Sequence, residues 1–240
     1  MLKHDIIKTI FVYIFAFFII AAPFFYYPDN KVTAVSSPFF IEENNVIVLD
    51  AGHGGEDGGA IGHAGIIEKD LNLSITLKAK SFFNFFGYDI VLTREDDRMT
   101  CDDGLKNQRE RKVSDIKNRL KLMEKTPCLC FISIHQNIFG GDAHGAQVFY
   151  SKNTDESKKL ANSLQSGISS LLQPENRRLT KEAGKNIYIL YHAQKPAVLV
   201  ECGFISNSKE AAMLSDNEYQ NKMAFAISVS AIKHLTEKEE

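Results

Sequence analysis

The sequence has almost no excess of charge of either sign. Its 240 residues include 28 Lys and Arg and 30 Asp and Glu, which gives a formal net charge of -2. It also lacks a dense run of basic residues with interleaved aromatic residues. Proteins that bind nucleic acid usually carry such a basic surface, so we expect no nucleic-acid partner.

Cysteine is scarce, with four residues in the chain and no Cys-x-x-Cys pair. Structural zinc sites built on thiolates usually need such pairs, so the sequence argues against one. Cys128 and Cys130 lie two apart in an apolar, strand-like run, where they face the same side and cannot readily bridge each other. We therefore expect free thiols, most of them buried, although an oxidising compartment would permit disulfides.

The N-terminus is strongly apolar. Lys3, His4 and Lys8 give a positive start, and no charged residue follows from Thr9 to Pro28. Such a stretch is typical of an export signal, so we assign residues 1–27 to a signal peptide or a membrane anchor. Residues 28–44 then have the mixed composition of a linker, and residues 45–240 form the main domain, which we expect to work outside the cytoplasm.

From Val46 onward, short apolar runs alternate with longer segments of helical period. Several runs are apolar on both faces, which favours a mainly parallel sheet covered by helices on both sides. The fold class is therefore α/β, as a single domain without internal repeats. We expect strands at 46–49, 88–94, 128–135, 145–150, 186–190 and 196–204, and helices at 69–87, 107–126, 155–172, 208–214 and 218–235.

Three of these strands end on residues that suit chemistry. The first runs into His53, the 128–135 strand ends on His135, and "PAVLVE" ends on Glu201. Because the carboxyl ends of parallel strands meet at one edge of a sheet, these side chains are expected to lie together. Glu68 begins the first helix and could join them. Glu201 is notable because an unpaired carboxylate among apolar neighbours is costly to bury.

Two imidazoles and a carboxylate form a ligand set typical of catalytic zinc, which keeps a fourth position open. The remaining carboxylate can then serve as general base and general acid. From spacing alone, Asp50 or Asp57 could replace Glu68 as the acidic ligand, and each histidine taken singly could be an ordinary structural residue. The other histidines of the domain fit less well, because none closes a buried strand: they are His63, His144, His192 and His234.

Six segments occur in the order of a known family. They are "VIVLDAGHGGEDGGAIG", "GIIEKDLNL", "LTREDD", "FISIHQN", "GAQVFY" and "PAVLVECGFISN", and they span about residues 46–235. Together they resemble the zinc-dependent N-acetylmuramoyl-L-alanine amidases of bacterial cell walls. The resemblance implies a sheet of about six strands, a peptidoglycan substrate, and hydrolysis of the amide between the muramic acid lactyl group and L-alanine.

The resemblance also assigns residues. His53, Glu68 and His135 match the zinc ligands of the family, and Glu201 matches its catalytic carboxylate. Gln136 departs from the small residue that usually follows the second histidine, which concerns substrate contact and not the metal.

The compact form is most similar to the spore-cortex, germination-specific amidases, which help to form muramic-δ-lactam. Only the short segment "FGGDAH" stands where some members of the family insert a blocking helix, and no second wall-binding domain is evident. We therefore expect an exported enzyme of the cell wall or spore cortex. An activating protein partner and contact with a membrane through the N-terminal segment alone are further expectations. The alternatives are a zinc peptidase of the stem peptide and a partner-dependent wall-binding protein.

Overall fold

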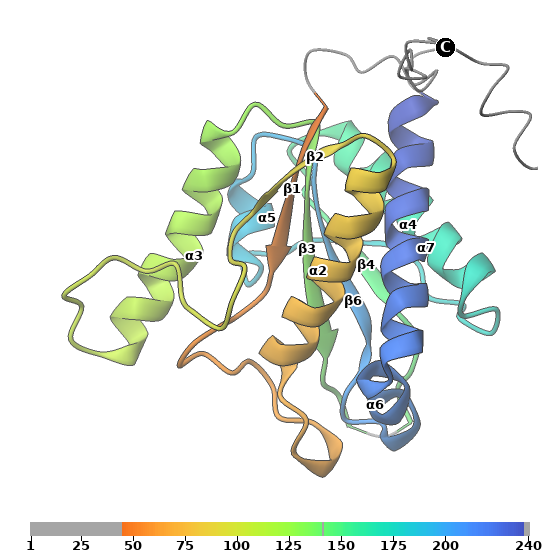
Figure 1. The fold of residues 1–240 in the computed structure, drawn as a ribbon, viewed down its shortest axis with the longest axis horizontal. Helices are drawn as coiled ribbons and strands as arrows, with labels where there is room; N and C mark the ends of the chain where they lie inside the picture. Colours follow the sequence, from red (N-terminus) through yellow and green to blue (C-terminus); the bar gives the residue numbers. More distant parts are fainter. Residues whose placement is uncertain (1–44, 141, 238–240) are drawn as a thin grey trace, which may run out of the picture. The chain divides into compact units, whose positions relative to one another are not determined.

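A six-stranded sheet with the order β2-β1-β3-β6-β4-β5 organises the domain (Figure 1). The computed structural model describes residues 45–140 and 142–237. β2, β1, β3 and β6 are parallel to one another, whereas β4 is antiparallel to β6 and β5 follows β4. The strands are β1 (Val46–Ala51), β2 (Asp89–Leu92), β3 (Cys130–Asn137), β4 (Gln147–Tyr150), β5 (Lys181–Glu182) and β6 (Ala197–Phe204). The prediction of a single, mainly parallel α/β domain is confirmed.

Helices cover both faces of the sheet unequally. One face packs against α2, α4, α6 and α7, and the other packs against α3 and the short α5. The helices are α2 (Glu68–Phe85), α3 (Gln108–Lys125), α4 (Asp155–Leu171), α5 (Tyr188–His192), α6 (Ser208–Ser215) and α7 (Asn217–Thr236), with a 3-10 turn η1 (His63–Gly65). The thinner cover on the α3 and α5 face leaves room for a site there.

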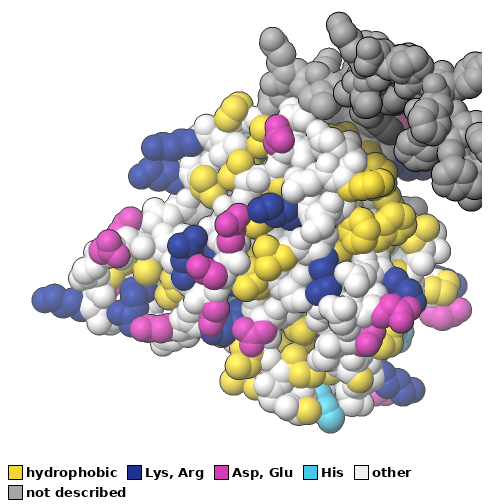
Figure 2. Space-filling view, in the orientation of Figure 1, with side chains coloured by type: hydrophobic (Ala, Val, Ile, Leu, Met, Phe, Trp, Pro, Cys, Tyr) yellow, Lys and Arg dark blue, Asp and Glu magenta, His cyan; other side chains and the backbone are white. Residues whose placement is uncertain are grey.

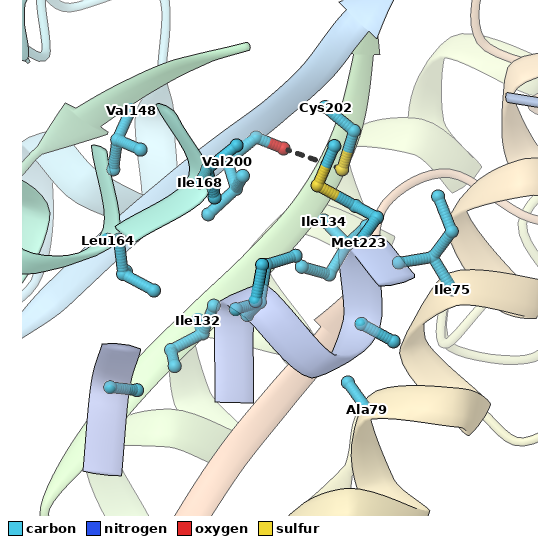
Figure 3. Packing of buried hydrophobic residues seen from close by; sticks show 14 of the residues in the cluster. Ile75, Ala79, Ile132, Ile134, Val148, Leu164, Ile168, Val200, Cys202 and Met223 are labelled. Carbon is cyan, nitrogen blue, oxygen red and sulfur yellow. Dashed lines mark hydrogen bonds between the residues drawn. The ribbon is translucent and has the colours of Figure 1, made fainter. Parts of the chain in front are cut away.

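The larger core lies on the four-helix side. Ile132 and Ile134 of β3 contribute to it together with Ile75 of α2, and Met223 of α7 packs into the same cluster (Figure 3). Neighbouring residues of the same strand, such as Phe131, point to the opposite face and build a smaller core with α3 and α5. This two-sided burial explains why the strands are continuous apolar runs in the sequence.

The start of α6 ties two strands together. Asn207 caps the helix by accepting a hydrogen bond from the backbone N–H of Glu210 at 3.3 Å. The carboxylate of Glu210 accepts instead from the backbone N–H groups of Gly145 (2.9 Å) and Phe204 (2.8 Å). It therefore joins the beginning of β4 to the end of β6.

One predicted strand is absent from the structure, and one short strand was not predicted. Residues 186–190 were expected to form a strand because of their β-branched and aromatic residues, but the chain forms α5 there and buries Leu190 against the sheet face. No strand was predicted between the 155–172 helix and residue 186, but β5 lies there; its residues Lys181 and Glu182 are exposed and pair at the edge with β4. Pairing through the backbone leaves little signal in such side chains.

The four cysteines are free, as expected; Cys130 and Cys202 are buried, and Cys101 and Cys128 are half-buried. On the face seen in Figure 2, basic and acidic side chains interleave without a broad patch of one sign. Within residues 45–140 and 142–237, no helix combines the length and the apolar character needed to cross a membrane. The predicted export segment and linker lie outside the described residues.

Candidate metal centre

The turn after β1 carries the first histidine. His53 has a φ of 62°, in the left-handed region that non-glycine residues seldom adopt. Its neighbour Gly52 lies against the ring of His135, so closely that a Cβ at Gly52 would stand 2.2 Å from Nε2 of that ring. The glycines around His53 therefore allow two imidazoles from different strands to approach each other.

His53, Glu68 and His135 form the candidate metal centre. One donor atom from each residue lies within 4.8 Å of the others. Oε1 of Glu68 is 2.9 Å from Nδ1 of His135 and 3.3 Å from Nε2 of His53. Within the parts of the chain that the structure describes, no other group of histidine, cysteine or acidic side chains converges in this way. The structure thus brings together three residues that are widely separated in sequence.

Glu68 is held rigidly at the first residue of α2. Its carboxylate is buried and accepts hydrogen bonds from the backbone N–H groups of Ala60 (2.9 Å) and Gln136 (3.2 Å) and from the side-chain amide of Asn72 (3.3 Å). Burial alone would raise the pKa of Glu68, but the two imidazoles outweigh it and hold that pKa well below its usual range. The carboxylate is therefore a fixed negative charge.

The centre favours positive charge. Burial alone would lower the pKa of His53, but the carboxylates of Asp57 and Glu68 raise it to about 9. Asp57 Oδ2 is 2.8 Å from Nδ1 of His53, and Asp57 Oδ1 accepts a hydrogen bond from Nζ of Lys112 at 3.0 Å. The ring nitrogen that faces Glu68 is therefore Nε2, and the contact of Asp57 with Nδ1 fixes the orientation of the ring.

Asp50 lies in β1 and has a structural role, outside the cluster of His53, Glu68 and His135. It is buried and accepts hydrogen bonds from Arg119 (2.6 Å), Ser133 (2.5 Å) and Thr93 (2.7 Å). Burial would raise its pKa, but Arg119 and the hydroxyl groups outweigh burial and lower the pKa to about 2. Of the three carboxylates that spacing left open, Glu68 alone joins the two histidines.

Two buried arginines hold the backbone of the turn. Arg119 donates to the carbonyl oxygens of Ala51 and His53, each at 2.7 Å. Arg94 donates to the carbonyl oxygens of Ala51 at 2.9 Å and Gly52 at 3.1 Å. All three consecutive carbonyl groups are thereby satisfied by guanidinium groups, which fixes the path that presents His53.

Glu201 lies beside the centre on β6, directly opposite His135 in the β3–β6 register. Its Oε2 is buried and, among the described residues, has no hydrogen-bond partner. Burial raises the pKa of Glu201 to about 7, against the opposing effect of His135. A buried carboxyl group with a pKa near neutrality can both accept and donate a proton, as general acid–base chemistry requires.

These residues face a cleft on the α3 and α5 side of the sheet. The cleft has a volume of about 480 Å³, and His53, His135 and Glu201 contribute to its lining. A larger groove of about 930 Å³ lies beside α6 and is lined by His63 and His144. None of the four predicted site residues lines that groove, so the smaller cleft is the one associated with the chemistry.

The sequence reasoning missed the supporting residues. Arg119, Lys112 and Asn72 lie within helices, where their spacing does not distinguish them from surface residues. The other predicted histidine candidates stay outside the cluster: His63, His144 and His192 are exposed and His234 is buried elsewhere.

Comparison with known proteins adds a family. A family profile described as N-acetylmuramoyl-L-alanine amidase matches residues 47–233. A germination-specific N-acetylmuramoyl-L-alanine amidase from Bacillus subtilis (strain 168) is 34% identical over 194 residues, covering 80% of this chain and 81% of its own length.

Solved structures agree with this. The CwlD amidase from Clostridioides difficile, in complex with the GerS lipoprotein, has a TM-score of 0.77 and 39% identity, covering 80% of this chain and 99% of that one. The N-acetylmuramoyl-L-alanine amidase AmiC2 of Nostoc punctiforme has a TM-score of 0.68 and 30% identity, and the match covers 80% of this chain and 97% of that chain.

Proposed function

This chain belongs to the N-acetylmuramoyl-L-alanine amidase family, and on that premise we propose that it is a zinc-dependent enzyme that hydrolyses the amide between the lactyl group of N-acetylmuramic acid and L-alanine in peptidoglycan. The family resemblance predicted from the six sequence segments is confirmed by the profile match over residues 47–233.

The donor set fits zinc. Two imidazoles and one carboxylate with donor atoms within 4.8 Å of one another suit a tetrahedral ion that keeps one position open. His53, Glu68 and His135 would hold it. When bound, zinc supplies Lewis-acid activation of water and of the scissile carbonyl. The fixed charge of Glu68 and the Asp57 contact to His53 keep the ligands oriented for the ion.

Glu201 supplies the proton transfers in this proposal. Its carboxylate takes a proton from the attacking water and then delivers a proton to the nitrogen of the departing L-alanine as the amide bond breaks. A group with a pKa of about 7 exchanges protons in both directions without a large energetic cost. The observation that carries the proposal is this unpartnered, buried carboxylate beside the His-Glu-His cluster.

Two variants of the zinc-loaded protein test these roles. Glu201→Gln should keep zinc and lose nearly all turnover, whereas His53→Ala should lose the metal. Mass spectrometry of digested peptidoglycan identifies the bond: an amidase releases peptides that begin with L-alanine and leaves the glycan free of peptide. Cleavage within the stem peptide would instead indicate a peptidase, and an active Glu201→Gln enzyme would refute the role of Glu201.

The cellular role is a finer proposal. The similarity to a germination-specific amidase supports the role that the family resemblance implies, which is action in the spore cortex and a contribution to muramic-δ-lactam formation. Because the Clostridioides difficile relative was solved in complex with a lipoprotein, we also propose an activating protein partner for this chain. Deletion of the gene should abolish muramic-δ-lactam in purified cortex, and unchanged lactam content would overturn this role.

A substrate in the wall requires an enzyme outside the cytoplasm. Export by the apolar segment at residues 1–27 therefore remains part of the proposal. Fractionation of cells that produce the full chain, with N-terminal sequencing of the mature protein, would distinguish a cleaved signal from a retained anchor. Recovery of the protein in the cytoplasm alone would contradict export.

A further inference from the structure

Besides its histidines, the lining of the active-site cleft contains one arginine and one lysine, Arg119 and Lys112. Arg119 is buried and fully engaged: its guanidinium donates to Asp50, to Asp115 and to the carbonyl oxygens of Ala51 and His53. These bonds use every N–H group of the guanidinium. Arg119 therefore has no donor left for a substrate.

Unlike Arg119, Lys112 is exposed and has unused hydrogen-bond donors. It projects from α3, and its side chain is 47% exposed at the mouth of the cleft. Its ammonium group carries three N–H donors, and the structure gives it a single hydrogen bond, to Oδ1 of Asp57 at 3.0 Å. The other carboxylate oxygen of Asp57 contacts His53, so the ammonium group lies one side chain away from the metal centre. Lys112 can accept an anionic group without breaking an existing contact.

The shape of the cleft indicates which part of the substrate, the glycan strand or the stem peptide, enters it. Phe131 and Leu199 of the sheet line its inner side, and residues 187–190 and Ile116 line its walls. A glycan strand continues in both directions and cannot enter such a pocket, whereas a stem peptide leaves the glycan at a single point. The peptide that begins with L-alanine therefore fits the cleft, with its scissile bond at the metal centre.

We infer that Lys112 binds the free α-carboxylate of the second residue of the stem peptide, a D-glutamate linked through its γ-carboxyl group. This inference rests on the proposed amidase function. One residue separates that carboxylate from the scissile nitrogen, a reach of roughly 7 Å, which suits an ammonium group one side chain away from the metal centre. Some peptidoglycans carry a neutral amide in place of this carboxylate, and Lys112 thus makes the enzyme selective for the acid form.

The test compares two synthetic muramoyl peptides that differ only at this position, one with the carboxylate and one with the carboxamide. With the zinc-loaded full chain, we expect kcat/KM to favour the carboxylate substrate on the order of tenfold, since a charge-assisted hydrogen bond is replaced by a neutral one. Lys112→Met should bring the ratio close to one, because kcat/KM on the carboxylate substrate should fall about tenfold further than kcat/KM on the carboxamide substrate. Lys112→Arg should retain the preference.

Lys117→Met is the matched control, because Lys117 is exposed on the same helix and does not line the cleft. It should leave both rates unchanged. An equal loss on both substrates in Lys112→Met would assign Lys112 to the support of Asp57 alone and overturn the inference. Equal rates of the unmodified enzyme on the two substrates would also overturn it. Failure of the unmodified enzyme to cleave either substrate would instead count against the proposed function, which keeps the two tests separate.

Discussion

Gly52→Ala adds one methyl group at the closest approach between the β1 turn and β3. The new Cβ would lie 2.2 Å from Nε2, 2.3 Å from Cε1 and 2.7 Å from Cδ2 of His135. Ordinary contacts between such atoms are about 3.5 Å, so the ring must move away by roughly 1.3 Å. Gly52 does not have a left-handed backbone conformation, so alanine is compatible with the backbone there. The steric clash is therefore with the ring of His135.

The displacement is large compared with what the site tolerates. Functional groups must be held within roughly 0.5 Å, and a misplacement of about 1 Å costs on the order of 100-fold. A retreating His135 also leaves the 2.9 Å contact with Glu68. We therefore expect Gly52→Ala to lower zinc affinity and turnover by at least about 100-fold. Overpacking by one methyl group costs about 1–3 kcal/mol of stability. The melting temperature should therefore fall by roughly 2–12 °C without loss of the fold.

Zinc affinity is measured by competition with a chromophoric chelator, turnover by release of peptides from peptidoglycan, and folding by circular dichroism. Gly140→Ala is the control, because a Cβ there meets no atom within 4 Å. It should behave like the unmodified chain. A folded Gly52→Ala protein that binds zinc and cleaves its substrate normally would refute the close packing of the turn against His135.

Three further predictions concern the supporting residues. Arg119→Met leaves the buried carboxylates of Asp50 and Asp115 unpaired, so the free energy of unfolding in urea should fall by about 3–5 kcal/mol; a loss below about 1 kcal/mol would contradict the buried ion pairs. Because the pKa of Asp50 is lowered from 3.8 to about 2 on folding, its contribution of about 2 kcal/mol is present above pH 4 and is lost as pH falls toward 2. Melting curves across this range should be less pH-dependent for Asp50→Asn, and an identical pH dependence would exclude Asp50 as the source. Asp57→Asn should weaken zinc binding by about 10–100-fold in the chelator competition, and unaltered affinity would show that His53 needs no support from Asp57.

The convergence of the site could be predicted because of the parallel sheet. Apolar runs that end on His53, His135 and Glu201 had to be central strands, and parallel central strands deliver their last residues to one edge. Glu68 could not be separated from Asp50 or Asp57 by spacing. The three carboxylates differ in what their side chains contact. Asp50 binds Arg119, and Asp57 contacts Nδ1 of His53, the ring nitrogen that does not face Glu68.

Where the sequence misled, tertiary contacts outweighed local preference. Ile187, Tyr188 and Ile189 favour a strand, but the chain forms α5 there, which packs Ile187, Ile189 and Leu190 into the smaller core on the sheet face. The contribution of Arg119 was equally hidden. Its partners at residues 50–53 lie more than sixty positions away, and only the packing of α3 against the sheet brings them within reach.

The guanidinium groups that hold the carbonyl oxygens of Ala51, Gly52 and His53 have one more consequence. Arg94 and Arg119 are permanent internal cations, so we expect the turn that presents His53 to keep its path whether or not an ion is bound. We therefore expect the chain to fold before it binds the proposed metal, so that the ion can be acquired after export.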